Sequence, residues 1–239
     1  MSDETKGSVA LRVATALAAA GAAAAGGPVG ALVGAGMKEV VDALFDTIYR
    51  RRLERATRMI EIGVQASGAA VDRFSETIED SPALLALLAA TVEAAMETPL
   101  EEKVYALGGC LGRAAADQAR VDAEMLRVRG LARIDNAEVK LMALLSEQPG
   151  WIPKEHGESR EPKRWLGWRR EEILQRLPGF AGVLDASLAR LVAEGLAFNA
   201  GLGTWASAAG QEQWALTDFG HDCLHLLEAT RQFRVGTEE

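Results

Sequence analysis

Two histidines, His221 and His225, lie four residues apart in a stretch near the end of the chain that is typical of a helix. This spacing can place two imidazoles on one helical face, as helices that bind zinc do. A closed metal site needs further ligands, but Cys223 falls on another side of the same helix and His156 lies in a distant polar segment. The pattern therefore predicts surface or core histidines and no metal site.

Adjacent carboxylates occur at Glu101 and Glu102 and again at Glu171 and Glu172. Neighbouring side chains diverge by about 100° on a helix, so neither pair can act on one substrate atom. Both pairs are typical of helix N-termini, where the helix dipole favours acids. The glycine-rich residues 108–112 lack the lysine of a phosphate-binding loop and predict close helix packing. Since no Ser-His-Asp or Cys-His set can be assembled, the sequence predicts a protein that is not an enzyme and needs no cofactor.

Basic residues gather between positions 154 and 176, with Trp165 and Trp168 among them, and this segment has the chemistry to bind a nucleic-acid backbone. A solvated loop whose tryptophans cover the core explains the same composition equally well. The net charge of the chain is -8, so any contact with DNA must be local. The candidate nucleic-acid-binding residues are Arg164, Arg169, Arg170, Arg190 and Trp205.

The stretch from residue 13 to residue 37 carries no charge and is dominated by alanine and glycine. Within it the glycines at every fourth position let another helix backbone approach closely, in a membrane or in a protein core. The interruption by Gly26-Gly27-Pro28 predicts a helical hairpin whose arms are shorter than the about 20 residues that span a bilayer. A band of arginines follows that suits either solvent or anionic lipid headgroups. The candidate membrane or oligomer contacts are Gly26, Gly30, Gly34, Arg50, Arg51 and Arg52.

The fold class predicted for the chain is mainly α, with an all-helical part before residue 135. Ser81 before Pro82, and Thr98-Pro99 with Glu101, are typical of capped helix N-termini. No stretch before residue 190 alternates with the period of a half-buried strand. The helices expected after the hairpin are a long one from Pro28 through Ile60, then 82–97, 99–116 and 122–134.

A second group of elements is expected after Asp135, which with Glu138 is typical of a capping box. A long polar loop, residues 148–167, follows the first helix of this group. The expected elements are helices 137–147, 169–177, 183–194 and 218–233, with strands 196–198 and 214–216 around a glycine-rich tip. Gly195 is placed to end the third of these helices.

This order resembles the winged helix-turn-helix superfamily. The resemblance depends on Leu188-x-x-Leu191-x-x-x-Gly195-Leu196 and on Trp214-x-Leu216-Thr217-x-x-Gly220. It implies that residues 183–194 are a recognition helix leading into a β-hairpin wing, a helix that fits the major groove of DNA. Because its charged residues are Asp185, Arg190 and Glu194, this helix offers little to phosphates or guanine edges.

The whole chain resembles, more loosely, the Abi-alpha family of abortive-infection proteins. The shared features are the Gly/Ala-rich start, the long helix, Thr98-Pro-Leu-Glu-Glu-Lys-Val-Tyr-Ala-Leu-Gly, and the ending Leu216-Thr217-Asp218-Phe219-Gly220. Tyr105 stands where the family usually has a tryptophan. This resemblance implies a role in phage defence.

Two domains are expected, a helical hairpin and bundle over residues 1–134 and a winged helix over 135–239. The leading hypothesis is a non-catalytic protein that self-associates or docks on a membrane through its N-terminus and binds a protein partner through the winged helix. The alternative is a DNA-binding regulator with a helical dimerisation domain. The acidic first residues predict a cytoplasmic chain, peripheral to the inner face of the membrane if lipid is bound. Cys110 and Cys223 are expected to be reduced and buried.

Overall fold

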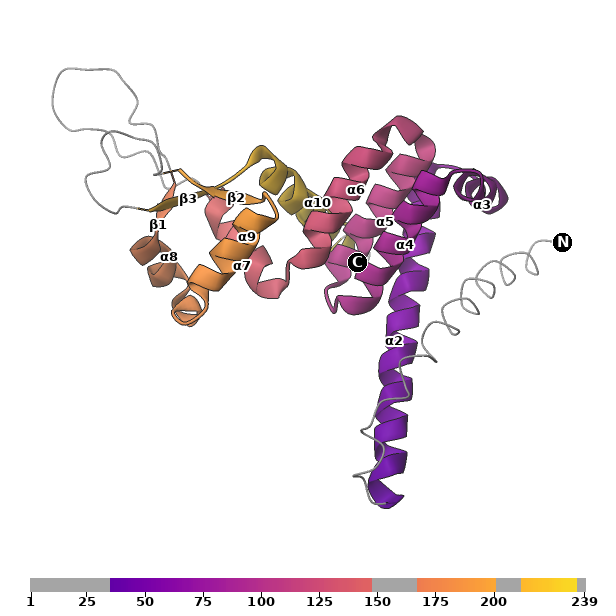
Figure 1. Ribbon diagram of the computed structural model, residues 1–239, viewed down its shortest axis with the longest axis horizontal. Coiled ribbons are helices and arrows are strands. Elements are labelled where there is room, and N and C mark those ends of the chain that lie inside the picture. Colours follow the sequence, from indigo (N-terminus) through magenta and orange to yellow (C-terminus); the bar gives the residue numbers. More distant parts are fainter. Residues whose placement is uncertain (1–34, 148–166, 201–211, 236–239) are drawn as a thin grey trace. The chain divides into compact units, whose positions relative to one another are not determined.

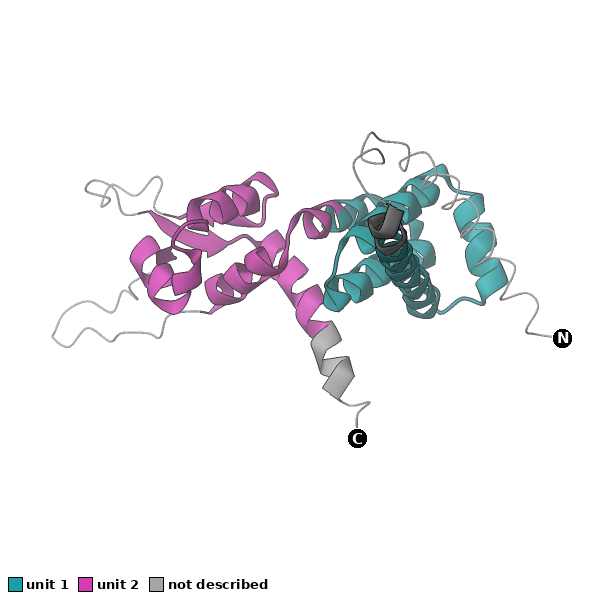
Figure 2. Cartoon of the chain, turned by 90° about the horizontal axis from the view of Figure 1, so that it is seen from below, with its two compact units in different colours: residues 1–128 teal, residues 129–239 magenta. Residues whose placement is uncertain are grey.

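The structure, a computed structural model, describes residues 35–147, 167–200 and 212–235. It is mainly helical and contains one small antiparallel sheet, as the sequence predicts for the fold class (Figure 1). The chain divides into two compact units, residues 1–128 and residues 129–239 (Figure 2). The predicted hairpin with Gly26, Gly30 and Gly34 lies outside the described residues.

Unit 1 is a helical bundle built on the 33-residue helix α2 (Ala35–Ser67). The second half of α2 packs along α5 (Glu101–Ala116) and α4 (Pro82–Glu97), and the short α3 (Val71–Glu79) lies beside α4. Figure 1 shows that the first half of α2 extends beyond the ends of α4 and α5. The side chains that fill the core of this bundle are large and apolar, among them Met59, Leu84, Leu87, Leu107 and Leu111.

The contact between α2 and α5 brings one helix backbone against the other. A Cβ atom added at Gly108 would lie 2.6 Å from the carbonyl oxygen of Met59, and one at Gly112 would lie 2.5 Å from that of Gly63. Neither distance leaves room for a side chain, so glycine is required at both positions. This confirms the prediction that the glycines in residues 108–112 serve close helix packing.

The helix starts of unit 1 follow the predicted caps in one case and depart from them in another. The amide of Leu84 donates to the Ser81 hydroxyl, and α4 has the expected bounds. The prediction that α5 begins at Pro99 is wrong, since Leu100 is the residue before its first turn. The Thr98 hydroxyl instead accepts a hydrogen bond from the amide of Leu100, which closes the turn between the two helices. A 3-10 turn (Gln118–Arg120) then leads into α6 (Val121–Arg133).

Unit 2 holds the sheet, whose strand order is β1-β3-β2 with antiparallel pairs throughout. The predicted hairpin of β2 with β3 is confirmed. A strand before residue 190 was not expected, because two residues are too few to show an alternating pattern. The elements are α7 (Asn136–Ser146), β1 (Trp168–Arg169), α8 (Arg170–Arg176), a 3-10 turn (Pro178–Phe180), α9 (Leu184–Ala193), β2 (Ala197–Asn199), β3 (Gln213–Leu216) and α10 (Asp218–Val235).

The segment that leads from α9 into β2 is hydrogen-bonded to the segment that leads from β3 into α10. Gly195 ends α9 with a φ of 70°, the left-handed conformation that the sequence predicted there. The Thr217 hydroxyl donates to the carbonyl oxygen of Gly195 at 2.7 Å and accepts from the amide of Gly220 at 2.9 Å. Gly220 is needed because a side chain there would run into the backbone of Leu196. In the pattern Leu-Thr-x-x-Gly, the threonine and the glycine are therefore the residues that allow the start of α10 to contact the end of α9.

We expect Gly108→Ala to destabilise unit 1 by about 1 to 3 kcal/mol, because the new methyl group overpacks the α2 contact. For a chain of this size that corresponds to a fall in Tm of several degrees, about 2–4 °C per kcal/mol. Gly109→Ala is the matched control, since a Cβ there lies 3.3 Å from one terminal nitrogen of Arg113 and meets no backbone. Thermal unfolding followed by circular dichroism compares the two, and equal Tm values would contradict the packing argument.

Candidate functional site

Two of the arginines predicted to contact nucleic acid are held in ion pairs within unit 2. The guanidinium of Arg170 pairs with Asp185 at the start of α9. Arg190 on α9 lies 3.3 Å from an oxygen of Asp135 and 3.4 Å from an oxygen of Glu138. These carboxylates compete with any phosphate for the same cations, so both arginines are weak candidates for DNA contacts.

The remaining predicted nucleic-acid residues are less constrained by the structure. Arg169 is exposed, and its backbone amide donates to Glu172 at 2.8 Å while its guanidinium has no ion pair among the described residues. Arg164 and Trp205 lie outside the described residues. The structure therefore places the consecutive Arg169 and Arg170 at the start of α8, and among the described residues it pairs Arg170 and Arg190 with different carboxylates.

Trp168 covers the core of unit 2. Its side chain is buried, and its indole Nε1 donates to the carbonyl oxygen of Glu147 at 2.9 Å. The guanidinium of Arg176 lies over the ring, 5.7 Å from its centre, in a cation–π contact. Of the two interpretations of this tryptophan, the core-covering one is confirmed, because a buried and capped ring cannot stack on a base.

Part of the exposed surface of α9 is apolar, and Asp185 and Arg190 are exposed beside that part. Ala186, Ala189 and Ala193 are exposed along the helix, and Val192 is 42% exposed beside them. Phe198 on β2 adds a large apolar side chain with 45% of its surface exposed. Such a surface offers no hydrogen bonds to base edges, whereas it is of the kind that protein partners cover.

The predicted arginine band on α2 separates into two parts. Arg55 donates to the carbonyl oxygens of Ala95 and Met96 at the end of α4, and Arg58 forms an ion pair with Glu101 at 3.0 Å. Arg50, Arg51 and Arg52 are exposed and form no ion pair with another described residue. The second part of the band thus holds the bundle together, and the first part is open to solvent.

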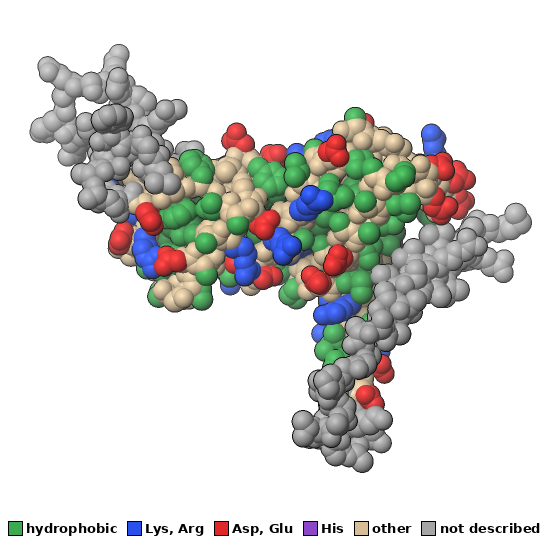
Figure 3. Space-filling view, viewed as in Figure 1, with side chains coloured by type: hydrophobic (Ala, Val, Ile, Leu, Met, Phe, Trp, Pro, Cys, Tyr) green, Lys and Arg blue, Asp and Glu red, His purple; other side chains and the backbone are tan. Residues whose placement is uncertain are grey.

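Large apolar side chains are exposed just before these open arginines. Leu44, Phe45 and Ile48 keep 57%, 64% and 49% of their surface exposed. Figure 3 shows apolar and charged side chains following one another along this part of α2. The helices that the structure describes include none with the length and apolar content to cross a bilayer. These exposed residues of the first half of α2 are therefore a candidate association surface, while the second half of the same helix packs on α4 and α5.

A buried ion-pair cluster joins α5 to α6, and the sequence analysis missed it. Glu124 is fully buried, and both of its oxygens accept from Arg113, at 2.9 and 2.8 Å. Arg127 approaches to 3.3 Å and Arg120 to 3.8 Å. The signal that could have revealed it was Arg127, three residues after Glu124 on the predicted helix 122–134, together with Arg120, four residues before Glu124 and just ahead of that helix.

The contacts within this cluster shift the pKa values of Glu124 and Arg113 so that both side chains favour their charged forms. Burial raises the pKa of the Glu124 carboxyl, but the hydrogen bonds and charge of Arg113, with smaller effects of Cys110 and Arg127, together lower it by more, so the pKa lies below its ordinary 4.5. The bond to Glu124 holds the pKa of Arg113 above its ordinary value. The carboxylate is ionised at neutral pH and closed to solvent, which suits a structural role and not proton transfer to a substrate.

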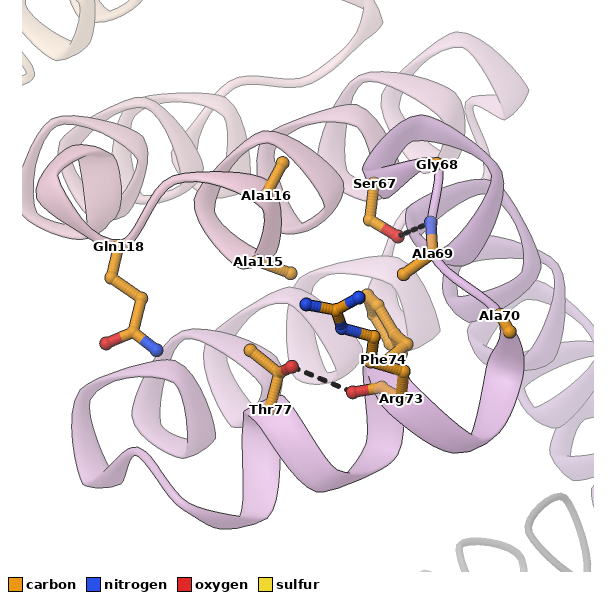
Figure 4. Close-up of a pocket in the computed structure, with 10 residues that line it drawn as sticks. All are labelled: Ser67, Gly68, Ala69, Ala70, Arg73, Phe74, Thr77, Ala115, Ala116 and Gln118. Carbon is orange, nitrogen blue, oxygen red and sulfur yellow. Dashed lines mark hydrogen bonds between the residues drawn. The ribbon is translucent and has the colours of Figure 1, made fainter.

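A pocket of about 550 Å³ lies in unit 1 beside the turn from α2 into α3. Figure 4 shows the guanidinium of Arg73 lying over it, between Phe74 and Ala115, with Gln118 at its side. The Thr77 hydroxyl on its wall already donates to the carbonyl oxygen of Arg73. This lining lacks the convergent acids, bases and nucleophiles of a catalytic site.

Possible metal ligands in the described residues do not gather. No group of three or more His, Cys, Asp or Glu side chains in residues 35–147, 167–200 and 212–235 is arranged to hold a metal ion. His221 and His225 are exposed on α10. Cys110 and Cys223 are buried and form no disulfide, which confirms the prediction for both.

Comparison of the chain with protein-family models, curated proteins and solved structures found no match. The two resemblances inferred from the sequence, to winged helices and to the Abi-alpha family, therefore stay predictions. The functional argument depends on the surfaces described above.

We expect Glu124→Gln to destabilise the protein by about 3 kcal/mol at neutral pH, since it leaves the guanidinium of Arg113 without its buried counter-charge. Because the folded-state pKa of Glu124 is lowered, its contribution is present above the ordinary pKa of 4.5 and is lost as the pH falls through the lower folded value. The difference in unfolding free energy between wild type and variant should shrink below that pH. Arg120→Ala is the control, with an expected loss of less than about 1 kcal/mol. Urea titrations across pH would contradict the prediction if the difference stayed constant.

Proposed function

We propose that unit 2 is a winged helix. Support comes from its element order, in which α7, β1, α8, α9, β2 and β3 follow one another, and from the sheet order β1-β3-β2. The hydrogen bonds among Gly195, Thr217 and Gly220 join the end of the helix before the wing to the start of α10, which follows the wing. In this proposal α9 is the presented helix and residues 200–212 connect the two wing strands.

We propose further that the chain is a non-catalytic adaptor whose winged helix binds a protein partner through α9. The observation that carries this proposal is the apolar part of the exposed surface of α9, formed by alanines and Val192, beside which Arg190, the one cation of α9, is held by Asp135 and Glu138. DNA binding draws most of its affinity from cations that neutralise phosphates. An alanine and valine face with a neutralised arginine supplies little of that, and it can instead bury apolar area against a protein.

The N-terminal part supplies attachment in this proposal, through self-association or through docking on a membrane surface. The exposed Leu44, Phe45 and Ile48, followed by the open Arg50, Arg51 and Arg52, support it. The resemblance to the Abi-alpha family adds a phage-defence context, in which the partner belongs to the infected cell or to the phage.

A DNA-binding regulator is the second candidate. One observation favours it: Arg169 and Arg170 lie side by side at the first turn of α8, and the guanidinium of Arg169 has no ion pair among the described residues. In this alternative unit 1 dimerises and α9 enters the major groove.

Titration of DNA with the purified protein separates the two functions. We expect no sequence-selective binding to the protein's own promoter or to genomic fragments at low salt. Selective binding that weakens with salt would contradict the adaptor proposal. In that case Arg169→Ala should lower the salt slope by about one unit per lost phosphate contact, while Arg170→Ala should lower it less because Asp185 already neutralises that arginine.

Substitution on the face of α9 tests the adaptor directly. Ala189→Glu should abolish copurification of the bound partner from host cells, because it places a charge in an apolar interface. Its Tm should stay within about 2 °C of wild type, since Ala189 is exposed. Ala123→Glu, on the exposed side of α6 in unit 1, is the control that should keep the partner. Retention of every partner by Ala189→Glu would show that α9 is not the binding surface.

A further inference from the structure

One face of α2 continues past the end of the bundle. Met59, Ile62, Gly63 and Ala66 meet α5 in the second half of the helix. Counting back from Met59 in steps of four and three residues passes through Arg55 and Arg52 and reaches Ile48 and Phe45. Such steps keep to one helical face. Phe45 and Ile48 thus extend the apolar face that packs on α5.

The last contact of this face with the bundle is made by Arg55. Its guanidinium donates to the carbonyl oxygens of Ala95 and Met96, at 3.2 and 2.8 Å, where α4 ends. Before Arg55 the exposed fractions of Phe45 and Ile48 rise to 64% and 49%. The same helical surface is therefore a helix–helix contact after Arg55, and before it, an exposed face that carries Phe45, Ile48 and Arg52 and is covered by no other described element.

Charge is distributed unevenly around this open face. Asp42 precedes Phe45 and Asp46 lies between Phe45 and Ile48, and both acids are exposed, whereas Arg50, Arg51 and Arg52 are exposed after Ile48. Two such helices placed antiparallel, with Phe45 of each opposite Ile48 of the other, bring Asp42 of each copy level with Arg51 of the other. Two placed parallel and in register bring like charges together, which is unfavourable.

We propose that residues 42–52 of α2 pair antiparallel with the same residues of a second copy of this chain. The two-fold axis passes between Asp46 and Thr47, so Phe45 of each copy meets Ile48 of the other. A two-fold interface of this kind is isologous, and one self-complementary patch is sufficient to form it. The inference rests on the self-association part of the proposed function and names its surface.

A second copy suits this surface better than a lipid bilayer does. Anionic headgroups would attract the three arginines but repel Asp42 and Asp46, which alternate with the apolar side chains. The paired segment is about 16 Å long at 1.5 Å per residue, so the dimer is weak and depends on protein concentration.

Sedimentation velocity of the full chain over a concentration series is the first test. Wild type should pass from monomer to dimer, and Phe45→Glu combined with Ile48→Glu should raise the dimer Kd on the order of 100-fold, because two apolar contacts per copy are lost. Leu126→Glu is the matched control, since Leu126 is an apolar residue on α6 with 59% exposure. All three proteins should keep the wild-type Tm, as each change is on the surface.

Charge exchange tests the orientation. A chain with Asp42→Arg and Asp46→Arg and a chain with Arg50→Asp, Arg51→Asp and Arg52→Asp should each be monomeric, while their mixture should form heterodimers. Added salt should weaken the wild-type dimer, because opposite charges face each other in the antiparallel pair. A wild-type dimer that strengthens with salt would overturn the antiparallel arrangement.

The outcomes separate this inference from the proposed function. A dimer that survives the double glutamate variant overturns the inference and leaves self-association in place, through another surface. A wild-type chain that stays monomeric at every concentration overturns both. If that monomer also sediments with phosphatidylserine-containing vesicles, the membrane alternative replaces them.

Discussion

Both units depend on places where one stretch of backbone passes another with no side chain between them. In unit 1 the carbonyl oxygens of Met59 and Gly63 occupy the space of side chains at Gly108 and Gly112. In unit 2 the start of α10 lies against the backbone of Leu196 at Gly220. A helix pair this close gains dispersion contacts along its whole length, but it tolerates no added methyl group. Glycine spacing therefore constrains which surfaces can meet, and the larger apolar residues fill the space around those contacts.

Local signals in the sequence were sufficient to predict most of the elements. Ser81 with Pro82 and Gly195 after α9 each mark a helix end by backbone chemistry that acts within a few residues. The short strand β1 was missed for the opposite reason, because it depends on pairing with β3 more than forty residues later and not on its own pattern. The start of α5 was predicted too early, since the Thr98 hydroxyl closes a turn instead of capping the helix.

The candidate sites were harder to predict, because the partners of charged residues lie far away in the sequence. The sequence does not show a partner for Arg190. In the structure α7 packs against α9, and Arg190 forms ion pairs with Asp135 and Glu138. Arg55 and Arg58 belonged to one predicted band with Arg50, Arg51 and Arg52, yet they bind α4 and α5. The spacing of apolar residues along α2 could not predict which of them are exposed. The same pattern runs through the whole helix, but only the residues of its second half are covered by α4 and α5.

The hydrogen bonds of Arg55 to the end of α4 also divide α2 by stability. We expect amides of α2 after Arg55 to exchange with solvent mainly when the bundle opens, because Arg55 and the residues after it are bonded to or packed on α4 and α5. Before Arg55, no side chain of residues 42–54 forms a hydrogen bond or ion pair with another described element. An isolated helix of that length is marginal in water, because few residues offset the cost of nucleation. Local unfolding should therefore begin at this end and stop near Arg55. The binding free energy of any molecule that stabilises the first half of α2 must offset the conformational entropy lost when that helix orders. Helix formation there is therefore coupled to binding.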